Sequence, residues 1–273
     1  MRFSRIIFDL DGVLYLGHKP IEGAPQALQK IRSSKIPISF LTNNATRSRK
    51  SIVQKLGKIG IFAEEEEIMS SAYAAAYYAS TLKPKTAFAI GEEGLYEEAK
   101  SLKLNLISQE QASKDGAQIL LTGLDRKLTY QKLRAGLRVL LKGAKWIACN
   151  PDTTYPVQDG IDPGSGSTTG ALAYCAGQIG KNAKIRLRMP DFIAGKPSNY
   201  MLKLLLAGKI PKNTAFIGDR TDIDMPFANK AGLASILALS GIAKKEDAKK
   251  AKGAHKPKYV INSVADLPDF LGL

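Results

Sequence analysis

This chain of 273 residues contains 44% hydrophobic and 24% charged residues, a composition typical of a folded protein with one large domain or two smaller ones. Its net charge of +15 favours anionic partners, but charge alone does not distinguish nucleic acid, anionic lipid and phosphorylated metabolites. No apolar run reaches the roughly 18 residues of a membrane helix, and Asp9 and Asp11 interrupt the first apolar segment too early for a signal peptide, so we expect a cytoplasmic protein with no membrane partner.

Strand-like and helical patterns alternate along almost the whole chain, beginning with an apolar, β-branched strand at Ile6. This alternation predicts an α/β fold, with parallel sheets that carry helices on both faces. The expected strands continue with residues 38–41, 86–90, 118–122, 146–149, 192–194, 214–217, 234–239 and 259–261. The expected helices cover residues 24–34, 47–59, 67–82, 92–102, 129–142, 167–179, 199–208 and 222–231, followed by a short C-terminal helix.

The number of expected strands bears on the domain organisation. About a dozen strands would be large for one sheet, which favours two α/β units over a single one. Candidate boundaries are Lys83-Pro84-Lys85 and the charged segment 181–190.

The first strand ends in two carboxylates, Asp9 and Asp11, which are followed by Gly12. Side chains two positions apart on an extended strand point to the same side, so both carboxylates would leave the carboxyl end of a central strand together, where open α/β sheets bind ligands. Two such charges repel unless a cation or a shared proton relieves them, and an aspartate can also act as a covalent nucleophile. A strand followed by an Asp-Gly turn with solvated carboxylates is the alternative interpretation.

Two further polar segments follow expected strands. Thr42, Asn43 and Asn44 offer hydroxyl and amide groups suited to a phosphate cradle, although the local pattern by itself favours Thr42 or Asn44 as the cap of the next helix. Lys196 follows the strand at 192–194 and precedes a helix start, which would place its ammonium against an anionic group. A solvated surface lysine is the alternative interpretation of Lys196.

A fourth segment carries Asp219, Asp222 and Asp224 just after an apolar strand. Asp219, at the strand end, is the better metal candidate, while Asp222 could cap the next helix. Oxygen ligands without His or Cys favour Mg²⁺ over zinc. Because each of the four segments follows a strand, a parallel sheet could bring them to one crevice. Their carboxylates, hydroxyl, amides and lysine suit phosphoryl transfer.

With these motifs in this order, the chain resembles the haloacid dehalogenase superfamily of phosphohydrolases over nearly its whole length. The subgroup it resembles is subfamily IIA, with the NagD, p-nitrophenyl phosphatase and phosphoglycolate phosphatase types, in which a large cap lies between the second and third motifs. The resemblance implies a Rossmann-like doubly wound parallel sheet as the hydrolase core, residues 1–83 and 190–273, with an inserted α/β cap of the C2 type at 84–189. The motifs that carry it are Asp9-Leu10-Asp11-Gly12-Val13-Leu14-Tyr15, Leu41-Thr42-Asn43-Asn44, Gly195-Lys196-Pro197 and Gly218-Asp219-Arg220 with Asp224, together with Gly123-Leu124-Asp125 and Asn150-Pro151-Asp152 in the cap.

The resemblance implies a Mg²⁺-dependent phosphatase that hydrolyses small phosphate monoesters through an aspartyl-phosphate intermediate. Asp9 would attack phosphorus, and Asp11 would act first as an acid toward the leaving group and then as a base toward water. A large cap that closes over the site argues for a small phosphorylated metabolite and against macromolecular substrates.

The same resemblance assigns the metal and phosphate contacts. The Asp9 carboxylate, the Asp11 backbone carbonyl and Asp219 would hold Mg²⁺. Asp224 would orient the water ligands of the metal from the second shell. The remaining contacts, to the phosphoryl oxygens and to the charge of the nucleophile, would come from Thr42, Asn43 and Lys196.

Several points of this interpretation stay open. Ile223 replaces a threonine common in the family, which puts a helper hydrogen bond in doubt but not the metal ligands. Asp125 and Arg126 could reach substrate, but a helix cap or a salt bridge is the favoured interpretation. The segment 162–168 could be a flexible cap loop or a helix start over the site, and a structural role and a contact with substrate are equally open for it. A phosphotransferase with the same intermediate is the alternative enzyme.

A nucleic-acid-binding protein that uses the basic surface is a less favoured alternative. The chain has no helix-turn-helix signal and no basic motif interleaved with aromatic residues, so we expect no specific nucleic-acid partner. The resemblance also allows a homodimer formed through the cap.

Overall fold

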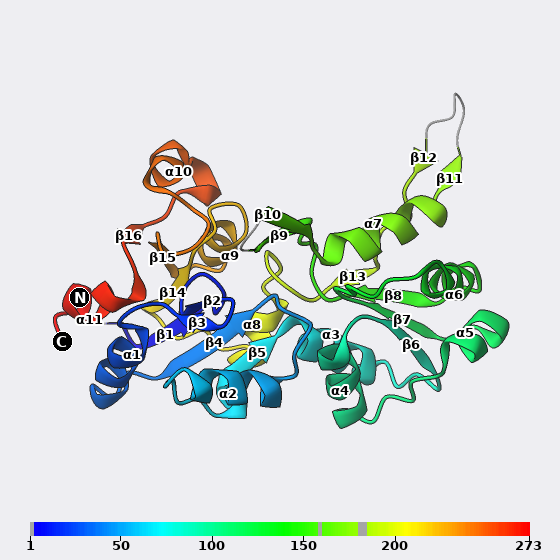
Figure 1. Cartoon of the computed structure of the whole chain (residues 1–273), viewed down its shortest axis with the longest axis horizontal. Coiled ribbons are helices and arrows are strands. Elements are labelled where there is room, and N and C mark those ends of the chain that lie inside the picture. The colour runs from blue at the N-terminus through cyan, green and yellow to red at the C-terminus, as the bar shows by residue number, and fades with distance from the viewer. Residues whose placement is uncertain (1–2, 158–159, 180–184) are drawn as a thin grey trace. The chain divides into compact units, whose positions relative to one another are not determined.

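The first sheet of the computed structural model has six strands in the order β16-β15-β14-β1-β4-β5, and neighbouring strands from β16 to β4 are parallel (Figure 1). The structure describes residues 3–157, 160–179 and 185–273. The strands are β1 (Arg5–Phe8), β4 (Ile38–Thr42), β5 (Ile68–Ser70), β14 (Thr214–Gly218), β15 (Ala234–Ala238) and β16 (Tyr259–Ile261). The helices that accompany them are α1 (Ala24–Ser33), α2 (Arg49–Lys58), α8 (Tyr200–Leu205), α9 (Asp224–Lys230), α10 (Lys245–Lys250) and α11 (Leu267–Leu271), with a hairpin of β2 (Tyr15–Leu16) and β3 (Lys19–Pro20).

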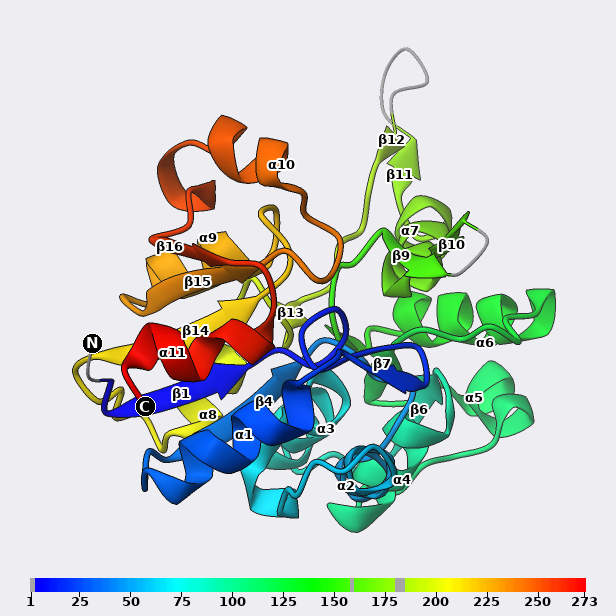
Figure 2. The same cartoon turned by 60° about the vertical axis from the view of Figure 1, so that its left-hand side comes forward.

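Helices cover both faces of this sheet, because alternate strand residues are apolar on both sides. Ile6 and Phe8 pack into a core shared with α1, α2 and α11, of which α1 and α11 lie over the sheet in Figure 2. On the other face the ring of Phe216 meets Phe227 of α9 edge-on, with centroids 5.0 Å apart. The predicted doubly wound parallel sheet is confirmed.

The second sheet has four parallel strands in the order β13-β8-β7-β6. Phe88, Leu120 and Trp146 on one face form a core with the helices α5, α6 and α7. Among the helices that the structure describes around both sheets, none combines the length and the apolar character that crossing a bilayer requires. The strands are β6 (Ala87–Ile90), β7 (Ile119–Thr122), β8 (Lys145–Ala148) and β13 (Phe192–Ile193), with hairpins of β9 (Thr154–Val157) and β10 (Gly160–Pro163) and of β11 (Gln178–Ile179) and β12 (Ile185–Arg186). The helices are α3 (Ser71–Thr81), α4 (Glu93–Ser101), α5 (Gln109–Asp115), α6 (Tyr130–Leu141) and α7 (Ser165–Cys175).

The chain separates into two units whose limits differ from the boundaries expected at 83/84 and 189/190. Helix α3 groups with the second unit because it packs there: its Tyr78 stacks on Phe192 of β13 with ring centroids 3.8 Å apart. The identity of the units as hydrolase core and inserted cap stays a prediction, and residues 181–184 of the expected boundary segment lie outside the described residues. The first unit contains Met1–Thr42, Ile52–Met69 and Lys196–Leu273, and the second contains Asn43–Ser51 and Ser70–Gly195.

Several elements differ from the sequence-based expectation, among them the three hairpins, β5 and α5. The helix expected at 67–82 begins only at Ser71, because residues 68–70 form the buried strand β5. A strand of three residues is too short to show an alternating pattern. Helix α5 was not expected, since Ala112 is the one buried residue among its seven.

Candidate active site

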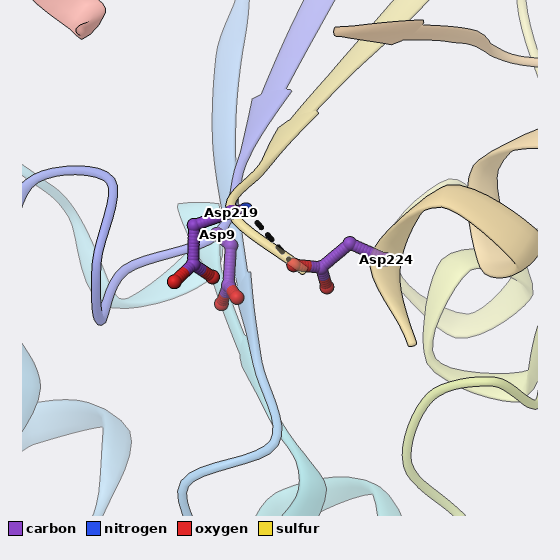
Figure 3. Close-up of side chains that lie close together, drawn as sticks. All are labelled: Asp9, Asp219 and Asp224. Atoms are coloured by element: carbon purple, nitrogen blue, oxygen red, sulfur yellow. Dashed lines mark hydrogen bonds between the residues drawn. The ribbon is translucent and has the colours of Figure 1, made fainter. Parts of the chain in front are cut away.

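Two buried carboxylates follow neighbouring strands at the carboxyl edge of the six-stranded sheet. Asp9 comes directly after β1 and Asp219 directly after β14, and the Asp9 N–H donates to the Ile217 carbonyl at 2.8 Å. Asp224, the first residue of α9, completes a cluster in which one carboxylate oxygen from each aspartate lies within 4.8 Å of the others (Figure 3). The exposed fractions of Asp9, Asp219 and Asp224 are 8%, 3% and 0%, so the cluster is shielded from bulk water.

Lys196 supplies a buried positive charge to this cluster. Its Nζ lies 2.9 Å from Asp9 Oδ2 and donates to Asp224 Oδ1 at 2.7 Å. Burial opposes the charged ammonium, but Asp224 and Asp9 outweigh that effect and hold the pKa of Lys196 above its ordinary value. The lysine therefore bridges two of the three carboxylates as a fixed ammonium ion.

The strand before Lys196 does not belong to the sheet that carries the aspartates. We expected one parallel sheet to bring all four motifs together, but β13 pairs with β8 in the four-stranded sheet. That expectation is wrong for the third motif. The chain crosses from the second unit to the first between Gly195 and Lys196, and the contacts of the lysine itself place it in the cluster.

Asp224 holds the loop after β14 in place. Its Oδ2 accepts the backbone N–H groups of Asp219 and Arg220, both at 3.1 Å, while its Oδ1 accepts from Lys196. Gly218 permits this approach, because a Cβ there would lie 2.5 Å from the Asp224 carboxylate. Asp224 is fully buried and accepts from three donors, Lys196 and the two backbone N–H groups, so it suits a supporting position behind a cation.

Asp219 is enclosed by backbone. Its Oδ2 accepts the Ile242 N–H at 2.8 Å, and a Cβ at either Gly12 or Gly241 would collide with that carboxylate. In Asp9, Oδ2 lies against Lys196, and Oδ1 accepts the Leu10 N–H at 2.8 Å. These contacts orient two carboxylates toward the same side, as Figure 3 shows.

The charges of the cluster do not balance, because three carboxylates and one ammonium leave two negative charges in excess. Burial raises the pKa of Asp9 well above its ordinary value; Lys196 acts against this, and Asp224 and Asp219 add to it. Burial and the Asp224 charge likewise raise the pKa of Asp219 to about 7. A divalent cation would offset both excess charges, and a donor set of carboxylate oxygens fits Mg²⁺.

Asp11 is not a member of the group of carboxylates whose oxygens lie within 4.8 Å of one another. We expected its carboxylate to leave the strand beside that of Asp9, but β1 ends at Phe8 and the chain turns, so the alternation of an extended strand no longer applies. Asp11 is exposed, and its Oδ2 accepts the Tyr15 hydroxyl at 3.3 Å. An exposed carboxyl group at the edge of a buried cluster can exchange protons with water, which the three buried aspartates cannot do as easily.

Thr42 and Asn43 fall on either side of a unit boundary. Thr42 is the buried last residue of β4, next to β1 in the sheet. Asn43 belongs to the second unit, where its side-chain amide donates to both oxygens of Asp152, at 3.0 and 3.2 Å. Its carbonyl accepts the Asn150 amide at 2.6 Å and the Ser71 hydroxyl at 2.5 Å.

These partners of Asn43 are distant in the sequence and were not expected. Asn150 and Asp152 were noted only as part of a cap motif, and Asp152 lies 109 positions from Asn43 along the chain. The favoured capping role for Thr42 or Asn44 is wrong. Helix α2 begins at Arg49, and Asn44 Oδ1 instead accepts the Thr46 N–H at 2.9 Å in a local turn.

The structure gives local partners to two residues of the second unit whose roles were open. Asp125 forms a buried salt bridge with Lys132 at 2.6 Å, and Arg126 pairs with Glu92 at 2.6 Å. The segment 162–168 contains the end of β10, which reaches Pro163, and the expected helix start, since α7 begins at Ser165. A contact of this segment with substrate stays a prediction.

A substitution at Gly241 tests the tight enclosure of Asp219. We expect Gly241→Ala to displace that carboxylate and to lower the free energy of unfolding by about 1–3 kcal/mol, the usual cost of overpacking. Gly57→Ala in α2 is the matched control, since a Cβ there meets nothing within 4 Å and alanine favours the helix. Urea unfolding of both variants measures the difference, and equal stability of the two would contradict the enclosure.

Comparisons with known proteins point to one family. A haloacid dehalogenase-like hydrolase model matches residues 6–105, and a HAD-hydrolase-like model matches residues 193–267. The 4-nitrophenylphosphatase of Schizosaccharomyces pombe is 31% identical over 98% of this chain and 94% of its own length. The solved p-nitrophenyl phosphatase from Archaeoglobus fulgidus is 32% identical with a TM-score of 0.87, covering 99% of this chain and 100% of that one. A glycerol phosphate phosphatase from Mycobacterium tuberculosis, solved in complex with magnesium, is 29% identical with a TM-score of 0.83, covering 97% and 77%.

Proposed function

The chain belongs to the haloacid dehalogenase-like hydrolases, and on that premise we propose that it is a Mg²⁺-dependent phosphatase of subfamily IIA that hydrolyses small phosphate monoesters through an aspartyl-phosphate on Asp9. The relatives named above are phosphatases, and one of them was solved with magnesium. The observation that carries the proposal is the buried cluster of Asp9, Asp219 and Asp224 around Lys196, which has the charge and the oxygen donors that this chemistry needs.

Asp9 is the nucleophile in this proposal. One of its carboxylate oxygens attacks phosphorus, and the bond from phosphorus to the ester oxygen breaks as Asp11 gives its proton to the departing alcohol. Asp11 then takes a proton from water, whose oxygen attacks the phosphorus of the aspartyl-phosphate. Inorganic phosphate leaves and the Asp9 carboxylate is restored. The exposure of Asp11 supports its role as the group that exchanges protons.

The other residues of the site manage charge and position. The Asp9 carboxylate, the Asp11 backbone carbonyl and Asp219 would hold Mg²⁺, which would supply the positive charge that lets a carboxylate approach a phosphate dianion. Lys196 holds Asp9 in place through its 2.9 Å contact, and Asp224 fixes both the lysine and the Asp219 loop.

Thr42 and Asn43 hold phosphoryl oxygens in this proposal. The carboxylate of Asp152 takes both hydrogen-bond contacts from the Asn43 amide nitrogen, which defines the orientation of that side chain. Because an amide oxygen cannot donate to a phosphoryl oxygen, the donors in this proposal are the Thr42 hydroxyl and the backbone N–H of Asn43, which the Asp152 contact helps to hold in a fixed arrangement. Two earlier expectations, a cytoplasmic location and a homodimer through the second unit, stay proposals alongside the activity.

Turnover of a substrate panel tests the function. We expect the purified chain to hydrolyse p-nitrophenyl phosphate and one or more small phosphorylated metabolites with Mg²⁺, and to lose at least about 10³-fold in rate when EDTA removes the metal. Bis(p-nitrophenyl) phosphate, a diester, is the control and should be a poor substrate. A chain that hydrolyses no monoester with Mg²⁺, or equally fast in EDTA, would contradict the proposal. Phosphate that appears on an added sugar instead of in solution would identify a phosphotransferase.

A further inference from the structure

A cavity of about 470 Å³ lies at the amino edge of the six-stranded sheet, the edge opposite to the aspartate cluster. Arg5 and Ser39 line it from the first residues of β1 and β4. Arg32 and Leu205 line it from the last turns of α1 and α8. Arg5 precedes Asp9 by four residues along β1, which is roughly 13 Å at the rise of a parallel strand. The cavity is therefore a separate site within the first unit.

Arg5 has few partners for a half-buried guanidinium. Within the described residues it makes one hydrogen bond, from Nη1 to Ser39 Oγ at 2.9 Å, and no carboxylate there lies close enough to pair with it. Its Nε is buried without a hydrogen-bond partner among the same residues. A guanidinium carries five N–H donors, and leaving a partly buried cation unpaired is unfavourable unless an anion satisfies it.

The neighbouring Arg32 also has a buried Nε without a hydrogen-bond partner, but unlike Arg5 it is paired with a carboxylate. Arg32 donates to both oxygens of Glu67, at 2.9 and 2.6 Å, so the charges of this pair cancel. The remaining charged groups that line the cavity are Arg5, Lys35 and Glu66, which leave one positive charge in excess. Lys35 and Glu66 are exposed at the rim, whereas Arg5 lies deeper.

We propose that this cavity binds a small oxyanion, the phosphate or carboxylate group of a metabolite, at Arg5. The planar guanidinium fork matches both groups in geometry. Ile36 and Leu205 give the cavity an apolar wall that an organic body can contact, and its volume falls within the range of about 300–1,000 Å³ typical of small-molecule sites. Binding here requires none of the residues of the aspartate cluster.

Equilibrium dialysis of the full chain tests this site, with inorganic phosphate and phenylphosphonate as probes and with EDTA present to weaken binding at the catalytic cluster. We expect Arg5→Gln to bind its probe about tenfold or more weakly than the wild type, because a charged donor pair is lost. Lys58→Gln, which removes an exposed lysine of α2, is the matched control and should bind as the wild type does. Tighter binding of phenylphosphonate than of phosphate identifies an organic ligand, and equal binding identifies the free oxyanion.

Two further variants keep the test informative if Arg5→Gln does not fold. Arg5→Lys keeps the charge without the fork and should bind with intermediate affinity, and Lys35→Asn at the rim should weaken binding severalfold. Turnover of p-nitrophenyl phosphate should be unchanged in Arg5→Gln, which separates this proposal from the proposed function. Absence of binding by the wild type, or equal binding by wild type and Arg5→Gln, would overturn the proposal.

Discussion

Asp9→Asn is expected to lower kcat for p-nitrophenyl phosphate by at least about 10³-fold, or about 4 kcal/mol in the activation barrier. The asparagine amide carries no negative charge and is a poor nucleophile toward phosphorus. The substitution keeps the size of the side chain, and the amide oxygen can still accept the Leu10 N–H. Lys196 retains Asp224 as a partner at 2.7 Å, so the geometry of the cluster should persist while the chemistry is lost. Steady-state assays of the purified variants measure the effect.

The stability of this variant separates chemistry from folding. Asparagine removes one of the two excess negative charges of the cluster, so in EDTA the thermal midpoint should equal or exceed that of the wild type. Asp269→Asn is the matched control, since that side chain is 89% exposed and makes only a long contact with Lys30 at 3.8 Å. It should leave kcat unchanged. Retained turnover in pure Asp9→Asn protein would refute nucleophilic attack by Asp9.

Asp11→Asn distinguishes the nucleophile from the proton-transfer group. The leaving group of p-nitrophenyl phosphate needs no proton, so transfer of the phosphoryl group to Asp9 can proceed in this variant. Hydrolysis of the aspartyl-phosphate still needs a base and is blocked, so phosphate should accumulate on the protein. Such an acyl phosphate is released by hydroxylamine. No protein-bound phosphate should be found on Asp9→Asn under the same conditions, so that variant is the control for attachment at Asp9.

The strands and most helices followed from the sequence because burial and periodicity determine them. The carboxyl ends of β1, β4 and β14 were located correctly, since their apolar runs end abruptly in polar residues, and neighbouring positions in a parallel sheet bring Asp9 and Asp219 together. The same reasoning failed for Lys196, because strand pairing between distant segments decides which sheet β13 joins. A local pattern carries no information about that pairing.

The positions of side chains that follow the strand ends could not be predicted from the local sequence pattern either. Whether Asp11 stays beside Asp9 depends on where the strand stops, and β1 stops three residues before Asp11. The Asn43 contact with Asp152 joins residues that are 109 positions apart. Arg5 looked like an ordinary residue at the start of a strand, and only the packing around it shows a cavity and a missing partner.

Asp219→Ala is expected to raise the Mg²⁺ concentration needed for half-maximal activity by at least about tenfold, because the variant loses a proposed direct ligand. It also loses the acceptor of the Ile242 N–H and leaves a gap beside Gly12 and Gly241. Asp219→Asn keeps that acceptor and that volume without the charge, so its Mg²⁺ requirement should fall between those of the wild type and the alanine variant. Turnover measured over a Mg²⁺ series gives the three values.

Calorimetric titration with Mg²⁺ in the absence of substrate shows whether Asp219→Ala weakens the binding of Mg²⁺. In EDTA two effects oppose each other in the alanine variant: it relieves the repulsion between Asp219 and Asp224, but it loses the hydrogen bond from Ile242 and the packing beside Gly12 and Gly241. The thermal midpoint of each protein in EDTA therefore serves as its own reference. Mg²⁺ raises the thermal midpoint only to the extent that it binds the folded protein. The midpoint of the wild type should therefore rise on addition of Mg²⁺, and that of the variant should rise less because it binds the metal more weakly. Asp222→Ala is the matched control, because Asp222 lies on the same loop but pairs with Arg220 at 2.6 Å outside the cluster. An Asp219→Ala titration that coincides with the wild-type and Asp222→Ala curves would remove Asp219 from the proposed metal site.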